Sequence, residues 1–134
     1  MPGTLHLLTL RAAVLLASGS ACAAQAQTVI TNSGVTIVAA DVRNIYVGEK
    51  LFTGAVRLVP VDNTDAQDKF LSKYLQVDGG KYNSIWAKKS FREGVNPPPV
   101  KATDGEVVDF VRRTPGAVGY IGDASKAVGV NIVK

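Results

Sequence analysis

The chain has 134 residues, the length of one ordinary domain, with 15 Lys and Arg against 11 Asp and Glu and a net charge of +4. Hydrophobic residues make up 46% of the chain and charged residues 19%, a composition typical of globular rather than disordered proteins. One Cys and one His exclude an intramolecular disulfide framework, a multi-cysteine zinc site and a three-histidine metal site. No apolar run reaches the roughly 20 residues that a membrane-spanning helix needs.

Residues 1–26 have the pattern of a secretory signal peptide. Arg11 supplies the positive charge, residues 12–17 (AAVLLA) form an apolar core, and Ala24-Gln25-Ala26 is the small-x-small motif that a signal peptidase requires. We therefore expect cleavage after Ala26 and a periplasmic or secreted domain at residues 27–134. A short buried helix is the alternative interpretation. Lipid attachment at Cys22 is disfavoured, because the lipoprotein pattern has a large aliphatic residue where Gly19 stands.

Cleavage after Ala26 would also remove most of the chain's catalytic chemistry. The single His (His6) and the single Cys (Cys22) would leave with the signal, and loss of Arg11 lowers the net charge from +4 to +3. Residues 27–134 then offer no thiol nucleophile, no imidazole base and no matched pair of acid and base groups. We expect a protein that is not an enzyme and that binds no cofactor and no metal.

The first part of the domain is predicted to form two strands with one helix between them. Residues 28–31 are rich in β-branched side chains and precede an Asn-Ser-Gly turn, which indicates a strand. Apolar residues at helical spacing predict a helix over about 38–47, ended by Gly48. Residues 55–61 (AVRLVPV) predict a strand in which Pro60 marks an edge or an end. Asp62-Asn63 predicts a turn.

Two helices are predicted next along the chain. Residues 64–67 (TDAQ) have the form of a capping box, and the helix they open is expected to run to about residue 76. Asp78-Gly79-Gly80 predicts a break before a helix over 81–90, which turns Tyr82, Ile85 and Trp86 inward.

The last part of the chain predicts a helix between a stiff connector and two strands. Pro97, Pro98 and Pro99 form the connector, and residues 103–106 (TDGE) form a second capping box whose helix stops at Thr114. Residues 117–121 and 128–133 predict strands. This alternation of strands and helices indicates a single α/β domain with some parallel pairing.

Three segments resemble a known family when they are taken together. They are residues 45–48 (IYVG), 58–61 (LVPV) and 114–121 (TPGAVGYI), with Phe70 and Trp86 between them. In this order they resemble the periplasmic phosphate-binding-protein-like family, the small relatives of the substrate-binding proteins of ABC phosphate transporters. The resemblance covers about residues 28–121. It implies an α/β fold that is a single lobe of a type 2 periplasmic-binding-protein-like fold, with a mixed sheet flanked by helices.

The segment that would hold phosphate departs from the family pattern. Full-length members bind their ligand between two lobes, and this chain has room for one. Their loop after the Val-Pro-Val strand carries an Arg and then a Ser-Gly-Thr run, whereas residues 62–69 here read DNTDAQDK, with Asn63 at the Arg position. We expect Asp62, Asp65 and Asp68 to lie where a phosphate would sit and to repel it.

A few polar side chains remain as candidates for ligand binding. They are Asn63, Thr64, Asp65 and Gln67, which could bind a small polar ligand through the amides at the helix start. An ordinary helix cap is the alternative interpretation and the one that the pattern favours. The spacing of the nearby aspartates does not match a calcium-binding loop. A basic cluster could form a positive face for an anionic polymer or for lipid headgroups; its members are Lys81, Lys88, Lys89, Arg92, Arg112 and Arg113.

Two functions remain open from the sequence. The first is a periplasmic or secreted solute-binding-like module, related to the phosphate transporter receptors, whose phosphate loop is degraded and whose ligand is a small anion or another small solute. The second is a periplasmic module that has lost its ligand and contacts a protein partner or a transporter component. Because the aromatic interleaving of nucleic-acid binders is missing, we expect no nucleic acid, and no segment is expected to span a membrane.

Overall fold

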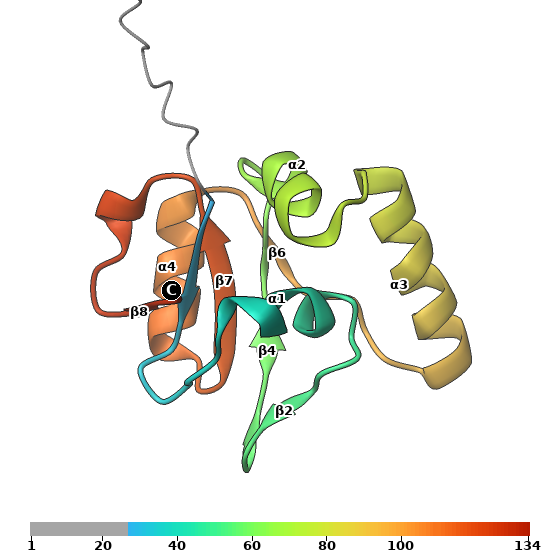
Figure 1. Ribbon diagram of the computed structural model, residues 1–134, viewed down its shortest axis with the longest axis horizontal. Coiled ribbons are helices and arrows are strands. Elements are labelled where there is room, and N and C mark those ends of the chain that lie inside the picture. The colour runs from blue at the N-terminus through green and yellow to red at the C-terminus, as the bar shows by residue number, and fades with distance from the viewer. Residues whose placement is uncertain (1–26) are drawn as a thin grey trace, which may run out of the picture.

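The computed structural model describes residues 27–134, and Figure 1 shows their arrangement. The predicted signal peptide, its cleavage after Ala26, and the candidate lipidation site Cys22 lie outside the described residues. The main sheet has the strand order β4-β7-β1-β8, formed by β1 (Thr28–Thr31), β4 (Val59–Pro60), β7 (Ala117–Ile121) and β8 (Asn131–Ile132). Strand β1 is antiparallel to β7 and β8, whereas β4 is parallel to β7, so the sheet is mixed as expected.

The strand that contains Pro60 continues beyond the main sheet. After β4, the Val61 amide donates to the Val118 carbonyl, and β5 (Asp62–Asn63) then pairs in parallel with β6 (Val100–Lys101). The predicted turn at Asp62-Asn63 is therefore wrong, because β6 supplies partners for these two residues. Proline lies on an edge strand of the four-stranded sheet, which agrees with its lack of an N–H donor.

Helices cover both faces of the sheet. One face packs against α1 (Ala39–Tyr46), α2 (Gln67–Phe70), the π-helical turn η1 (Leu71–Leu75) and α3 (Gly79–Glu93), and the other packs against α4 (Asp104–Arg113). Strand β7 contributes side chains to the cores on both faces of the sheet, because successive side chains of a strand point to opposite faces. Val118 and Tyr120 belong to the core cluster on the α1 side, whereas Ala117 and Ile121 belong to the cluster on the α4 side. This mixed sheet between helices confirms the expected fold class.

Aromatic rings form the centre of the larger core. Phe70 is fully buried and stacks on Tyr120, with ring centroids 3.7 Å apart and ring planes 3° from parallel. Tyr46 meets the Phe70 ring edge-on at 4.7 Å, and its hydroxyl lies 2.8 Å from the Val61 carbonyl oxygen and 3.1 Å from that of Val118. Tyr82 and Trp86 are also buried, as predicted, whereas Ile85, which was expected to face inward with them, is half-buried.

Helix α4 approaches the sheet closely because β7 has a glycine at the contact. A Cβ atom on Gly119 would lie 2.7 Å from a methyl group of Val107 and 2.9 Å from one of Val111. Any larger residue at position 119 would push α4 away from the sheet. The glycine in the GYI motif therefore sets the spacing of the smaller core.

The structure confirms one predicted helix cap and moves the start of another helix. The Thr103 hydroxyl accepts from the Glu106 amide at 3.3 Å and Glu106 accepts from the Ala102 amide at 2.9 Å, so the second capping box is confirmed with a one-residue shift of its return bond. Helix α3 starts earlier than predicted, because Asp78 caps it by accepting from the Lys81 amide. The break before α3 lies at Gln76, whose φ is +53°.

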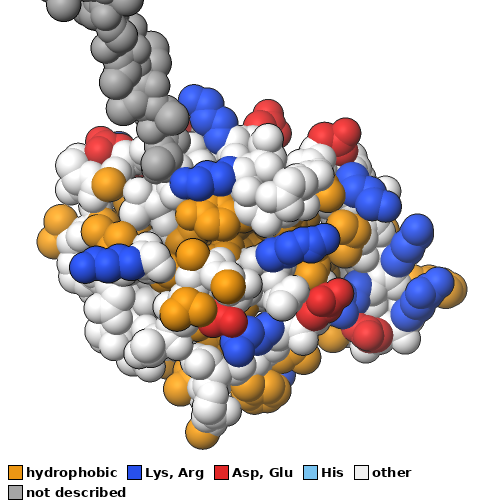
Figure 2. All heavy atoms as spheres, in the orientation of Figure 1, with side chains coloured by type: hydrophobic (Ala, Val, Ile, Leu, Met, Phe, Trp, Pro, Cys, Tyr) orange, Lys and Arg blue, Asp and Glu red, His pale blue; other side chains and the backbone are white. Residues whose placement is uncertain are grey.

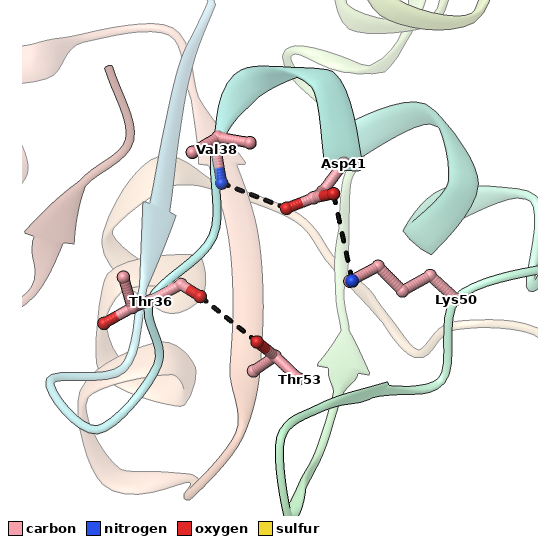
Figure 3. A network of polar contacts seen from close by, with 5 residues as sticks. All are labelled: Thr36, Val38, Asp41, Lys50 and Thr53. Carbon is pink, nitrogen blue, oxygen red and sulfur yellow. Dashed lines mark hydrogen bonds and ion pairs between the residues drawn. The ribbon is translucent and has the colours of Figure 1, made fainter.

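A short hairpin, formed by β2 (Phe52–Thr53) and β3 (Val56–Arg57), projects from the lower edge of the molecule in Figure 1. Figure 3 shows how it is tied to the first part of the chain: the Thr53 hydroxyl donates to the Thr36 carbonyl at 3.2 Å. The predicted strand over 55–61 is thus divided between this hairpin and β4. The final strand is also shorter than predicted, since only Asn131–Ile132 pairs with β1.

Candidate functional site

Parallel strands end together at one edge of the molecule, and this edge is the candidate site. Strand β5 ends at Asn63 and β7 ends at Ile121, and the first residues of α4 lie beside them. In open α/β sheets, ligands bind beyond the carboxyl ends of the strands. We call this region the strand-end site. It contains three of the four candidate residues from the sequence, Asn63, Thr64 and Asp65.

Asp62 does not face the strand-end site. Its side chain is buried, and its carboxylate accepts hydrogen bonds from the Tyr82 and Tyr120 hydroxyls, each at 2.8 Å. Burial raises the pKa of Asp62 above its ordinary value, although hydrogen bonds from Tyr82, Tyr120 and Gln67 act in the opposite direction. The expectation that Asp62, Asp65 and Asp68 form one repulsive group is therefore wrong: Asp65 and Asp68 are exposed, while Asp62 belongs to the core.

Asn63 shapes the loop that follows β5. Its side-chain oxygen accepts from the Asp65 amide at 3.1 Å, and its Nδ2 donates to the Tyr120 carbonyl at 3.0 Å. The predicted capping box over 64–67 is wrong, because the residue before α2 is Ala66 and no side chain caps that helix. Thr64 is exposed and Gln67 is half-buried. Asn63 thus positions the loop and is already bonded within the protein.

The most informative group at the strand-end site is the Asp104 carboxylate. It accepts from Asn63 Nδ2 at 2.7 Å, from the Gly122 amide at 3.1 Å and from the Asp123 amide at 3.0 Å. It also stands in the first turn of α4, where the helix dipole favours negative charge. Backbone amides at a helix start are the donors that commonly bind an anion. Here the Asp104 side chain instead accepts from two amides of the loop after β7, those of Gly122 and Asp123, so a carboxylate of the protein itself occupies these donors.

The surface around Asp104 is a shallow pocket of about 320 Å³ with mixed charges. Its charged lining residues are Asp65, Lys69, Asp104, Asp123 and Lys126. The three carboxylates outnumber the two ammonium groups. Hydrogen bonds from the Ser125 hydroxyl and amide lower the pKa of Asp123, so this residue carries its charge at neutral pH. The pocket as a whole is unfavourable for a phosphate dianion.

Sequence reasoning missed the role of Asp104. It identified the residue only as part of a helix cap, because the Gly122 and Asp123 amides come from a loop far along the chain. The basic residues that were grouped in the sequence are divided in the structure: Lys81, Lys88, Lys89 and Arg92 lie on α3, whereas Arg112 and Arg113 lie on α4, across the sheet. Figure 2 shows Lys and Arg side chains gathered over α3 at the right of the molecule.

Within residues 27–134, no group of three or more His, Cys, Asp or Glu side chains could hold a metal ion. In the same part of the chain, every helix is too short or too polar to cross a membrane. Neither finding bears on residues 1–26.

Replacement of Asp104 by Ala should lower the free energy of unfolding by about 1–3 kcal/mol, because three donors lose their shared acceptor. Urea denaturation would measure the change. Asp109→Ala is the matched control, because Asp109 is exposed on the same helix. Within residues 27–134, its only ion pair is with Arg112, at 2.6 Å. The control should change stability by no more than about 0.5 kcal/mol. Equal losses in the two variants would contradict the role given to Asp104.

Comparison with known proteins gives matches in structure only. No family model and no curated protein matches the sequence. The structure resembles that of PstS from Borrelia burgdorferi, with 22% identity and a TM-score of 0.52 over 81% of this chain. It also resembles an ABC-type phosphate transport receptor from Vibrio cholerae, with 16% identity and a TM-score of 0.51 over 81% of this chain.

The chain spans less than half of each of these structures, 46% of the first and 45% of the second. At such identities the matches establish the fold and leave the ligand open. The size of the matched part corresponds to a single lobe. Residues 27–134 therefore have a phosphate-binding-protein-like fold, a mixed α/β lobe that agrees with the resemblance seen in the sequence.

Proposed function

We propose that this chain is a periplasmic or secreted binding-protein-like module that no longer captures phosphate at its strand-end site and instead contacts another protein there. The main observation behind the proposal is the Asp104 carboxylate, which accepts from Asn63 Nδ2 and from the Gly122 and Asp123 amides, so that these donors are not available to an anion. The exposed carboxylates and ammonium groups of the same edge support a polar protein contact.

Calorimetry tests the loss of ligand capture. Titration of the protein with phosphate and with sulfate is expected to give no heat beyond dilution at millimolar concentrations, because the net charge of the pocket opposes binding. In Asp104→Ala the donors become free, and weak binding of either anion should appear. Saturable binding of phosphate by the unmodified protein would reject the proposal and favour the second candidate, solute capture, which the fold likeness to phosphate receptors supports.

Gel filtration of the protein from its native extract, after crosslinking, tests the partner contact. We expect a species larger than the monomer. Asp65→Lys and Asp123→Lys, which reverse charge at the exposed strand-end site, should return the protein to monomer size, whereas Asp109→Lys on the outer face of α4 should not. A strictly monomeric protein in the extract would contradict the proposal.

The proposed location has its own test. N-terminal sequencing of the protein recovered from the periplasm or medium should start at Gln27, because Ala24-Gln25-Ala26 meets the small-x-small requirement of the peptidase. Ala26→Arg should block cleavage and leave a longer, cell-associated chain. Recovery of the unmodified protein with residues 1–26 intact would reject the signal-peptide interpretation.

A further inference from the structure

A second pocket lies at the opposite end of the parallel strands. It has a volume of about 410 Å³ and lies where β4 begins, between the β2–β3 hairpin, the C-terminal part of α3 and the three-proline connector. Pockets of this size hold small organic molecules in many proteins. We call it the strand-start pocket. It shares no lining residue with the strand-end site.

Apolar side chains form much of the strand-start pocket. Ile45, Leu58 and Trp86 line it and are 1%, 5% and 7% exposed, so they are fixed by the core behind them. The Trp86 indole is held in one orientation because its Nε1 donates to the Tyr46 carbonyl at 3.0 Å. The prolines at 97–99 give a stiff wall. The pocket is therefore preformed, with a surface suited to an apolar ligand body.

Three basic side chains line the same pocket, Lys50, Arg57 and Lys89. The stem of Lys89 fits closely over Gly48, where a Cβ atom would lie 2.5 Å from Lys89 Cε and 3.0 Å from the Trp86 ring. Gly48 also has a φ of +77°, which a side chain would strain. The absence of a side chain at position 48 thus lets a lysine stem and the indole ring meet at the pocket.

Carboxylates neutralise two of these three basic groups. Lys89 Nζ lies 3.1 Å from a Glu93 oxygen. Lys50 Nζ lies 3.8 Å from an Asp41 oxygen, and Figure 3 shows how these two side chains face each other. Within residues 27–134, Arg57 pairs with no carboxylate, and its guanidinium lies 5.6 Å from the centre of the Phe52 ring. One positive charge therefore remains at the pocket, which matches a single negative charge on a ligand.

We propose that the strand-start pocket binds a small organic monoanion, a carboxylate that carries an aromatic or branched apolar body. The carboxylate lies towards Arg57, whose planar guanidinium can donate two parallel hydrogen bonds, and the apolar body packs against Trp86 and Leu58. A phosphate dianion fits less well, because it would exceed the single unpaired charge and leave the apolar surface uncovered. The proposal is independent of the function proposed above, since it concerns the other end of the strands.

The single Trp of the chain gives a local readout. Phenylacetate, added to isotope-labelled protein, should shift the indole signal of Trp86 in a proton–nitrogen correlation spectrum until the site is saturated. Phenylacetamide has the same aromatic ring, with a neutral amide in place of the carboxylate. It should bind at least about tenfold more weakly, because it loses the charged hydrogen bonds to Arg57. Arg57→Gln should weaken phenylacetate to a similar extent and leave the affinity for phenylacetamide unchanged.

Arg113→Gln is the matched control, because Arg113 is exposed on α4, across the sheet, and this variant should keep the affinity for phenylacetate. Arg57 is also exposed, so its replacement is expected to preserve the fold, which the remaining amide signals would verify. Equal affinity for phenylacetate and phenylacetamide would overturn the proposal, as would an unmoved Trp86 signal at millimolar phenylacetate. An equal loss in Arg57→Gln and Arg113→Gln would overturn it as well.

Discussion

Phe70→Ala is expected to lower the free energy of unfolding by about 3–5 kcal/mol, the usual range for removal of a buried aromatic ring. Phe70 is fully buried, stacks on Tyr120 at 3.7 Å and meets the edge of Tyr46 at 4.7 Å. Truncation would leave a cavity at the point where α2, α1 and β7 meet. Urea denaturation followed by circular dichroism would measure the loss.

Phe91→Ala is the matched control, because it removes the same atoms from a side chain that is 92% exposed on α3. It should change stability by no more than about 0.5 kcal/mol. If Phe70→Ala does not fold, Phe70→Leu still tests the point, since it retains most of the buried volume and should show an intermediate loss. Similar effects at positions 70 and 91 would contradict the packing described for the core.

Raising the pH above about 10, the ordinary pKa of tyrosine, is expected to unfold the protein. Burial, followed by the negative charge of Asp62, raises the pKa values of Tyr46, Tyr82 and Tyr120. A raised pKa means that the folded state keeps its tyrosines neutral while the unfolded chain ionises. The stabilising contribution is therefore fully present below pH 10 and is lost as the pH rises towards the folded-state values.

The free energy of unfolding is expected to fall steeply as the pH rises, because the three tyrosines act together. Each contributes about 1.4 kcal/mol per pH unit above pH 10, so the free energy of unfolding should fall by about 4 kcal/mol per unit. Tyrosinate absorbance and circular dichroism should change in one cooperative step. Tyr82→Phe should reduce the slope by about a third. Gradual ionisation of these tyrosines in a protein that keeps its native circular dichroism would contradict this prediction.

Local sequence signals predicted those elements that depend on local contacts. The strand at Thr28–Thr31, the strand at Ala117–Ile121 and the cap at Thr103 were all identified, because β-branched runs and a Thr-x-x-Glu motif act within a few residues. Asp62 and Asn63 were assigned to a turn, since both are typical turn residues. Their strand pairing depends on Val100 and Lys101, which no local pattern identifies.

The candidate site shows the same limit. Asn63 and Thr64 are both short polar residues before a helix, and sequence alone favoured Thr64 as the cap, whereas Asn63 makes the turn. The structural role of Asp104 depends on the backbone amides of Gly122 and Asp123, which come within hydrogen-bond distance of its carboxylate only in the folded protein. Likewise, the three aspartates at 62, 65 and 68 looked alike in the sequence, and burial separates Asp62 from the others.

Strand β1 pairs with β7 on one side and with β8 on the other, although it is the first strand of the described chain and they are the last two. Strand β1 thus has no strand partner in the main sheet until the segment that carries β7 and β8 is present. Such distant pairing slows folding relative to helix formation, since a long loop must close before any contact compensates for its entropy. The main sheet of the described residues is therefore expected to close late in folding, after the helices that depend on local contacts have formed.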